Sequence, residues 1–214
     1  LYTAGFSVLP SSLDYGYENL TDPYAFDAEA AAKLLDDAGI VDTNGDGIRE
    51  LDGQEVVLHY VTYPNRCLND FAEAIQQQLA SVGIGVDLEI GDSARQWDSY
   101  QSGDFDLNGS NWTTVGAGDP TEYLAAWCST SGANYCGYKN EEYDALYDQL
   151  SSTFDGGARR DIIQRMQQIL IDDAAVVVHG YYNSSMISRN ATVGGAAIHT
   201  ADYYWLTDEI YPAA

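Results

Sequence analysis

The stretch EVVLHYVTYPNRCLNDFAEAIQQQLASVGIGVDLEI, residues 55–90, places an amphipathic segment between two apolar ones. EVVLHYVT is apolar on both faces apart from His59, as expected of a buried strand. IGVDLEI alternates apolar and acidic residues, which is typical of a strand with one buried face. Between them we expect a helix that Asn69 caps and Gly83 ends. Strand, helix and strand within about 36 residues predict a parallel pair joined by a right-handed crossover.

Helix signals flank this stretch on both sides. Asp27 caps an apolar helical pattern that Gly39 ends, Asn140 caps another, and a long helix begins near Gly157. Asp119-Pro120-Thr121-Glu122 is a helix start with Asp at the N-cap. Two further strands are expected, DFDLNGSNW (104–112) and AVVVHGYY (175–182). The order of elements predicts an α/β fold in which helices cover a mixed sheet.

The composition restricts the class of partner. The 214 residues carry 33 acids against 9 bases, a net charge of -24, and such a surface repels nucleic acid and anionic membranes. Hydrophobic residues make up 45%, enough for a real core. No apolar run approaches the ~18 residues of a membrane helix. The sequence begins at Leu1 without an initiator Met, and we interpret it as an excised piece or a mature product.

The three cysteines have no zinc-ligand spacing. Two of them lie close together in the Ser- and Gly-rich segment WCSTSGANYC (127–136). We predict a disulfide between Cys128 and Cys136, as in an exported protein, which leaves Cys67 unpaired. Three free thiols are the alternative.

Candidate binding residues follow from the strand ends. In open α/β sheets, ligands sit beyond the carboxyl ends of the strands. Here those ends are 62–66 and 111–114, and both combine a ring with polar groups. His59 and His179 lie within predicted strands, and the sequence holds neither GxSxG nor HExxH, so the pattern does not favour an enzyme.

Six segments in order resemble the carboxyl-terminal part of extracellular solute-binding proteins of family 5, the dipeptide-, oligopeptide- and nickel-binding components of ABC importers. They are FDAEAAAKLLDDAGIVDTNGDGIRELDGQEVVLHYVTYPN, FAEAIQQQLASVGIGVDLEI, SGDFDLNGSNW, GDPTEYL, NYCGYKNEEYDALYDQL and RRDIIQRMQQILIDDAAVVVHGYY. Each segment alone is weak evidence, but the ordered set is specific and covers nearly the whole chain.

The resemblance implies the two-lobed, type II periplasmic-binding-protein-like fold. Residues 1–182 would form the second lobe, with a mixed sheet flanked by helices, and 183–214 would return toward the first lobe. The implied function is the capture of a peptide-like solute or small chelate, such as a nickel chelate, for an ABC importer. The implied partners are that solute and the importer's membrane subunits. The resemblance also implies a monomer that lies outside the cytoplasm, in the extracellular space or the periplasm. The full-length parent would be a lipoprotein anchored to the membrane.

The resemblance also suggests site residues. Peptide-binding relatives carry an acid soon after the strand-ending Trp, where it pairs with the amino terminus of the peptide. In the stretch Trp112–Asp119 here, no acid follows the Trp early, and the loop looks longer. Asp119 is the remaining candidate, although a structural N-cap role is favoured for it. We expect Trp112 to stack on the solute, Arg66 to neutralise an anionic group, and His199 to be a weaker candidate for a metal complex. The full predicted set is Tyr63, Arg66, Trp112, Thr113, Thr114, Asp119 and His199.

The segment DTNGDGIRE, residues 42–50, resembles the start of a calcium loop. Its members Asp42, Asn44, Asp46, Gly47 and Ile48 fit positions 1, 3, 5, 6 and 7 of an EF-hand. Position 12 is Gly53 rather than Glu, so Asp52 or Glu50 would have to serve. We expect a compact turn formed by Asx-turns with no cofactor required, and a weak calcium site over Asp42–Asp52 is the alternative. The alternative function, that of a calcium-dependent surface or adhesion module, is based on this loop alone.

Overall fold

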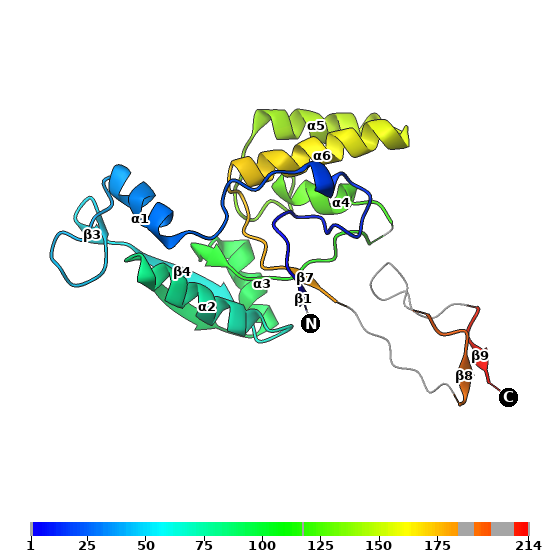
Figure 1. Ribbon diagram of the computed structural model, residues 1–214, viewed down its shortest axis with the longest axis horizontal. Coiled ribbons are helices and arrows are strands. Elements are labelled where there is room, and N and C mark those ends of the chain that lie inside the picture. Colours follow the sequence, from blue (N-terminus) through cyan, green and yellow to red (C-terminus); the bar gives the residue numbers. More distant parts are fainter. Residues whose placement is uncertain (1, 117, 184–190, 198–207, 214) are drawn as a thin grey trace. The chain divides into compact units, whose positions relative to one another are not determined.

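The computed structural model describes residues 2–116, 118–183, 191–197 and 208–213 (Figure 1). The chain divides into two compact units. We call Pro23–Trp112 the βαβ unit, and Leu1–Asp22 together with Thr113–Ala214 the helical unit. The predicted lobe boundary at residue 182 lies inside the helical unit and stays a prediction. Among the described residues, no helix is both long and apolar enough to cross a bilayer.

The βαβ unit is built on a three-stranded parallel sheet with the order β5-β4-β6. Its strands are β4 (Val57–Thr62), β5 (Gly85–Ile90) and β6 (Leu107–Asn108). The register of β4 and β5 runs from Val57 opposite Gly85 to Thr62 opposite Ile90. The α/β class and the predicted parallel pair are therefore confirmed, and the described antiparallel pairings form separate small sheets.

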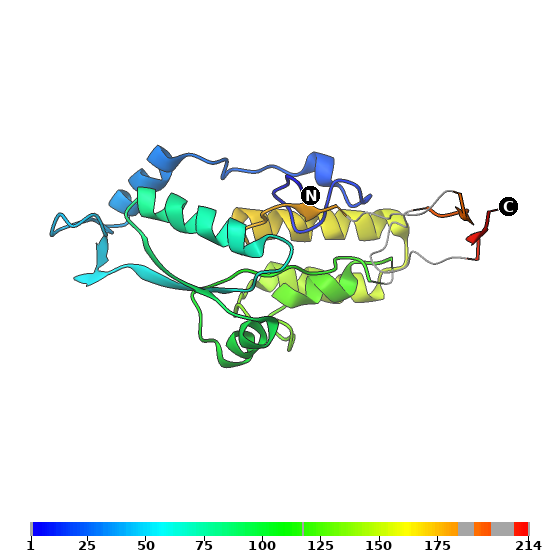
Figure 2. The same ribbon diagram turned by 90° about the horizontal axis from the view of Figure 1, so that it is seen from below.

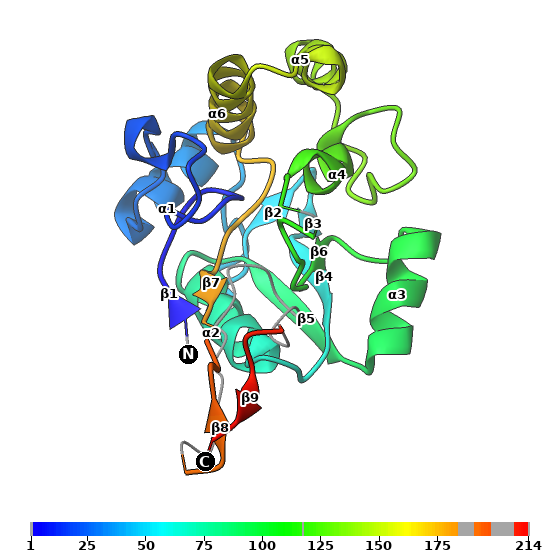
Figure 3. The same cartoon turned by 90° about the vertical axis from the view of Figure 1, so that its right-hand side faces the viewer.

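Two helices cover this sheet. Helix α2 (Leu68–Ser81) joins β4 to β5, and helix α3 (Ser93–Ser102) joins β5 to β6. The first connection crosses the sheet in one direction and the second crosses back. Right-handed crossovers then require the two helices to lie on opposite faces, as Figures 2 and 3 show. The core of the unit includes Tyr60, Val61, Leu68, Ala72 and Ile84.

Helix α2 does not begin where we predicted. Its first residue is Leu68, so Asn69 lies inside the helix, where its side chain donates to Asp70. The preceding Arg66 and Cys67 have left-handed backbones, with φ of 50° and 58°. This sharp turn lets the Leu68 N–H donate to the Asn65 carbonyl at 3.0 Å and buries the Leu68 side chain. Asn69 is therefore the wrong cap.

The remaining elements of the βαβ unit precede the sheet. Helix α1 (Ala28–Asp37) begins as predicted, because Asp27 Oδ1 accepts from the Ala30 N–H at 2.9 Å. The loop after α1 leads into a hairpin of β2 (Glu50–Leu51) and β3 (Gln54–Glu55).

The helical unit is organised around α5 (Glu141–Ser152) and α6 (Gly156–Asp172), which pack side by side (Figure 1). The short α4 (Thr121–Leu124) and the 3-10 helices η1 (Tyr17–Asn19) and η2 (Ala125–Trp127) complete its helices as described. The predicted cap of α5 is confirmed, because Asn140 Oδ1 accepts from the Tyr143 N–H at 3.0 Å. The core includes Val8, Leu9, Leu124, Tyr143, Leu150, Ile163, Met166 and Leu170.

Short antiparallel pairs connect distant parts of this unit. Strand β1 (Tyr2–Thr3) pairs with β7 (Tyr181–Tyr182), and β8 (Val193–Gly194) pairs with β9 (Tyr211–Pro212). The predicted strand over 175–182 is wrong except for these last two residues. Its valines do alternate, with Val176 and Val178 against the core and Val177 75% exposed. Val176 and Val178 pack against the hydrophobic core, and no strand pairs with these two valines in the described structure.

The predicted disulfide is not formed, and all three cysteines are free. Cys128 follows η2 and is buried, with its sulfur 3.4 Å from Thr130 Oγ1. Cys136 is exposed, and its thiol donates to Asn134 Oδ1 at 3.3 Å. Each sulfur thus contacts a different polar neighbour, Thr130 for Cys128 and Asn134 for Cys136, instead of the other cysteine.

A buried glutamine ties the N-terminal segment to α6. The side chains of Ser7 and Gln167 are both fully buried, and the Ser7 hydroxyl donates to Gln167 Oε1 at 2.8 Å. Gln167 Nε2 in turn donates to the Tyr15 carbonyl at 2.8 Å. The Tyr181 hydroxyl donates to the Ser7 carbonyl, also at 2.8 Å. A single amide of α6 thus satisfies two polar groups of the N-terminal segment, which lie 160 and 152 residues earlier in the sequence.

We predict that Gln167→Leu destabilises the chain by about 1–3 kcal/mol, because the Tyr15 carbonyl and Ser7 hydroxyl lose their partner inside the protein. Urea unfolding followed by circular dichroism measures the loss. Gln149→Leu is the matched control, since Gln149 is an exposed position on α5. Equal stability of the two variants would contradict the proposed role of Gln167.

We predict that a maleimide reagent modifies Cys136 of the native chain quickly and Cys128 only after denaturation, because their exposures differ. Mass spectrometry of the labelled peptides gives the order. Denaturation without reductant should expose three reactive thiols. A single reactive thiol, on Cys67, would restore the disulfide interpretation.

Candidate functional site

Two loops meet at the carboxyl edge of the parallel sheet. Tyr63 directly follows β4, and Asn111 and Trp112 follow β6 on the neighbouring side. The Tyr63 hydroxyl donates to Asn111 Oδ1 at 2.6 Å. The structure thus joins the two strand ends that the sequence indicated as a binding edge.

Gly109 holds the β6 loop close to β4. Its N–H donates to the Val61 carbonyl at 2.9 Å, and its own carbonyl accepts from Thr62 Oγ1 at 3.0 Å. A Cβ at this position would lie 2.8 Å from both Thr62 Oγ1 and the Tyr60 hydroxyl. Only glycine permits this approach, and the approach directs the following residues toward Tyr63.

The side chains at this edge offer varied chemistry. Trp112 is 47% exposed and supplies an aromatic surface. Tyr63 and Arg66 are half-buried and supply a phenol and a guanidinium. The left-handed backbone at Arg66 places it in the turn between β4 and α2. The edge can therefore stack on a planar or apolar group and hydrogen-bond to polar ones.

Asp119 of the helical unit is engaged through both of its carboxylate oxygens. Oδ1 accepts from the Thr121 N–H at 2.9 Å and contacts the Thr121 hydroxyl, while Oδ2 accepts from Arg159 Nη2 at 2.6 Å. Arg159 also donates to the carbonyls of Leu150 and Thr153. Asp119 therefore anchors the start of α4 to Arg159 on α6, and Arg159 in turn holds the end of α5. Pro120 occupies the N-cap position that we expected Asp119 to hold.

The protonation of Asp119 reflects these contacts. Burial alone raises the pKa of this carboxyl, but the hydrogen bonds from Thr121 and the Arg159 guanidinium outweigh it, so the pKa lies below its usual value. A carboxylate held in this way is a structural anion of the helical unit.

The predicted binding residues fall into two groups. Tyr63, Arg66 and Trp112 belong to the βαβ unit, while Thr113, Thr114 and Asp119 belong to the helical unit. Thr113 and Thr114 are half-buried in the segment before α4. That all six residues surround one ligand stays a prediction. His199 lies outside the described residues.

An ion-pair network that sequence reasoning missed lies on the βαβ sheet. Glu89 accepts two hydrogen bonds from Arg95, at 2.7 and 2.8 Å, and lies 3.1 Å from His59 Nε2. Arg95 also pairs with Asp104 at 2.9 Å. The Arg95 guanidinium lowers the pKa of Glu89. The β4–β5 register puts His59 and Glu89 on the same face, which is the signal that could have found the pair.

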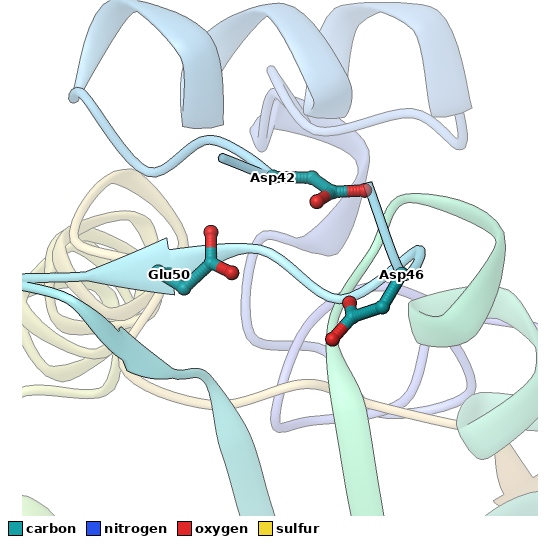
Figure 4. A group of neighbouring side chains, drawn as sticks. All are labelled: Asp42, Asp46 and Glu50. Atoms are coloured by element: carbon teal, nitrogen blue, oxygen red, sulfur yellow. The ribbon is translucent and has the colours of Figure 1, made fainter. Parts of the chain in front are cut away.

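The acidic loop between α1 and β2 is a compact turn, as expected. Asp42 accepts from the N–H groups of Gly45 and Gly47 at 2.6 and 2.9 Å, and Asp46 Oδ1 accepts from the Ile48 N–H at 2.8 Å. These N–H donors lower the pKa of Asp42. One carboxylate oxygen from each of Asp42, Asp46 and Glu50 lies within 4.8 Å of the others (Figure 4). Within the described residues, this is the group that could hold a metal ion.

Known proteins match this chain along most of its length. The family model of the bacterial extracellular solute-binding proteins, family 5 Middle, matches residues 1–135. The oligopeptide-binding protein AppA of Bacillus subtilis is 27% identical over 180 residues, which cover 83% of this chain and 33% of that protein.

Two solved structures share the fold. AppA from Bacillus subtilis in complex with a nonapeptide has a TM-score of 0.75 at 25% identity, covering 84% of this chain and 36% of that one. NikA from Brucella suis in complex with Fe(III)-EDTA has a TM-score of 0.68 at 27% identity, covering 79% and 35%. The chain spans about a third of the length of the curated relatives that it matches.

We predict that Asp119→Asn lowers stability at pH 7 by about 1 kcal/mol, since the Arg159 guanidinium loses its charged partner in a partly buried ion pair. Because the folded pKa of Asp119 is depressed, its stabilisation is present above the unfolded pKa of about 3.9 and is lost as the pH falls through the folded value. The difference in free energy of unfolding between variant and wild type should therefore become smaller as the pH is lowered, as measured by urea titrations. Asp161→Asn, at an exposed position of α6, is the control. If this difference in free energy stayed constant down to pH 2–3, about one unit below the unfolded pKa, the depressed pKa of Asp119 would be contradicted.

Proposed function

Because this chain belongs to the bacterial extracellular solute-binding proteins of family 5, we propose that it forms part of the substrate-binding component of an ABC import system. It works outside the cytoplasm, where it captures a solute and passes it to the importer's membrane subunits. The family match and the relatives named as oligopeptide- and dipeptide-binding proteins support this proposal. The adhesion alternative has no support from them.

The observation that carries the proposal is the hydrogen bond between Tyr63 and Asn111 at the carboxyl edge of the sheet. It fixes the loops after β4 and β6 beside each other, and Trp112 follows directly with nearly half of its surface exposed. Ligands of open α/β sheets bind at such an edge. A half-exposed tryptophan on a fixed loop suits a binding surface, because its rigid ring loses little entropy on contact.

We assign roles by chemistry. Trp112 stacks on the solute, and Tyr63 holds the loop that carries it. Arg66 neutralises an anionic group of the solute, which a chain of net charge -24 would otherwise repel. Thr113 and Thr114 provide hydroxyl groups at the start of the next segment.

The proposed solute is a peptide or a small metal chelate. A structural relative from Bacillus subtilis holds a nonapeptide, and another from Brucella suis holds Fe(III)-EDTA. Asp119 is a poor receptor for a peptide amino group, because Thr121 and Arg159 already use both of its oxygens. Peptide binding would therefore need another acid to receive the amino terminus.

We further propose that the chain works within a longer, monomeric and membrane-anchored parent that supplies the opposing lobe. The relatives are about three times as long as the matched part, which supports a longer parent. A small-molecule site usually buries most of its ligand. One side of a cleft provides only part of that surface.

We predict that the 214-residue chain binds solutes weakly, while the longer parent binds one class tightly. Thermal-shift screening of both proteins against peptides of two to nine residues and against nickel and Fe(III) chelates measures this difference. A peptide hit and a chelate hit distinguish the two solute classes. Tight binding by the short chain alone would refute the need for an opposing lobe, and no hit with the folded parent would refute the solute-binding role.

In the parent, Trp112→Ala should weaken binding about tenfold to thirtyfold, the equivalent of roughly 1.5–2 kcal/mol. Trp97→Ala is the matched control, because Trp97 is 49% exposed but lies on α3, away from the strand ends. Equal losses in both variants would place the solute elsewhere.

A further inference from the structure

Glu50 carries a buried carboxylate oxygen that has no hydrogen-bond partner among the described residues. The residue begins β2 and is only 7% exposed. Its Oε2 accepts from the N–H and hydroxyl of Thr43, at 2.7 and 3.1 Å. Its Oε1 is buried and makes no hydrogen bond to any residue that the structure describes. An unpaired buried charge is costly, so such an oxygen indicates a missing positive partner.

The unpartnered oxygen belongs to a carboxylate directed at two other acids. Figure 4 shows the Glu50 carboxylate pointing into the space between Asp42 and Asp46, and one oxygen from each lies within 4.8 Å of the others. The closest base in the sequence, Arg49, points elsewhere. It donates to Asp36 at 2.5 Å and to the carbonyls of Ile40 and Val82 at 2.7 Å each. No ion pair offsets the three acids within the described part of the chain.

We propose that Asp42, Asp46 and Glu50 bind one calcium ion. The donors are all hard oxygens, and oxygen-only sites select calcium or magnesium over the metals that prefer nitrogen or sulfur. Magnesium demands near-ideal octahedral geometry, whereas calcium accepts irregular loops with more ligands. Asn44 and Ile48 occupy the third and seventh positions, which are also ligand positions in an EF-hand loop. Glu50 stands at the ninth position and takes over the role of the absent acid at the twelfth.

The ion has a structural role in this loop. Glu50 also pairs with Val41 across the base of the loop, where its N–H donates to the Val41 carbonyl at 3.0 Å. Calcium bound between Asp42 and Glu50 would close the loop just above that pair and hold the end of α1 to β2. We expect a dissociation constant of about 10⁻⁴–10⁻³ M, the range of extracellular calcium modules.

The test uses the 214-residue chain stripped with EDTA, titrated with CaCl₂ by calorimetry and melted with and without CaCl₂. The wild type should bind about one ion and melt at a higher temperature with calcium. Glu50→Gln should weaken binding at least tenfold. In EDTA, this variant should melt at or above the wild-type temperature, because a neutral amide replaces an unpaired buried charge and can donate to the neighbouring acids. The order of the two melting temperatures should therefore reverse between calcium and EDTA. Without a calcium site, the order would be the same in both conditions.

Asp46→Asn removes a ligand from the exposed part of the loop and should also weaken binding at least tenfold. Asp52→Asn is the matched control, since Asp52 lies in the adjacent hairpin turn outside the cluster, and it should bind like the wild type. No calcium binding up to about 10 mM, ten times the weakest affinity expected, would overturn the proposal. Unchanged binding by Glu50→Gln and Asp46→Asn would also overturn it. Equal stabilisation by MgCl₂ would indicate general screening of the acidic surface and reject a calcium site.

Discussion

Strand β4 is hydrogen-bonded to parallel partners on both of its edges, and the organisation of the βαβ unit depends on this. Val61 and Thr62 at its end are completely buried. Beyond the ladder, the Gly91 N–H donates to the Thr62 carbonyl and the Gly109 N–H donates to the Val61 carbonyl, each at 2.9 Å. The segments that follow β5 and β6 are therefore both fixed beside the end of β4. The loops after them leave the sheet at the same edge. The candidate binding edge is a direct result of this pairing.

Features encoded by neighbouring residues could be predicted from the sequence. The caps at Asp27 and Asn140 depend on a side chain and an N–H three residues later, and both are confirmed. The βαβ crossover follows from local periodicity and handedness. The strand predicted at 175–182 failed because alternation alone does not supply a partner strand. The start of α2 was wrong because two non-glycine residues take a left-handed backbone, which composition does not reveal.

The same distinction applies to the candidate site. The rule for strand ends indicated Tyr63 and Trp112, but the bond from Tyr63 to Asn111 joins loops 48 residues apart and needed the structure. The calcium-like pattern at Asp42 was visible in the sequence. The decisive property of Glu50, one satisfied oxygen and one buried without a partner, depends on how Thr43 and the hairpin pack around it. Burial of single atoms is not encoded in any short motif.

The helical unit is discontinuous in the sequence, because Leu1–Asp22 and Thr113–Ala214 build it together and the βαβ unit is inserted between them. Ser7 must find Gln167, a partner 160 residues further along the chain. During synthesis on a ribosome, the βαβ unit is complete when Trp112 has emerged, and it can fold at once from local contacts. The first 22 residues have to wait until α6 and β7 have been made. Apolar residues such as Val8 and Leu9 stay uncovered through that interval, so this segment is exposed to aggregation or to chaperones until its partners are made.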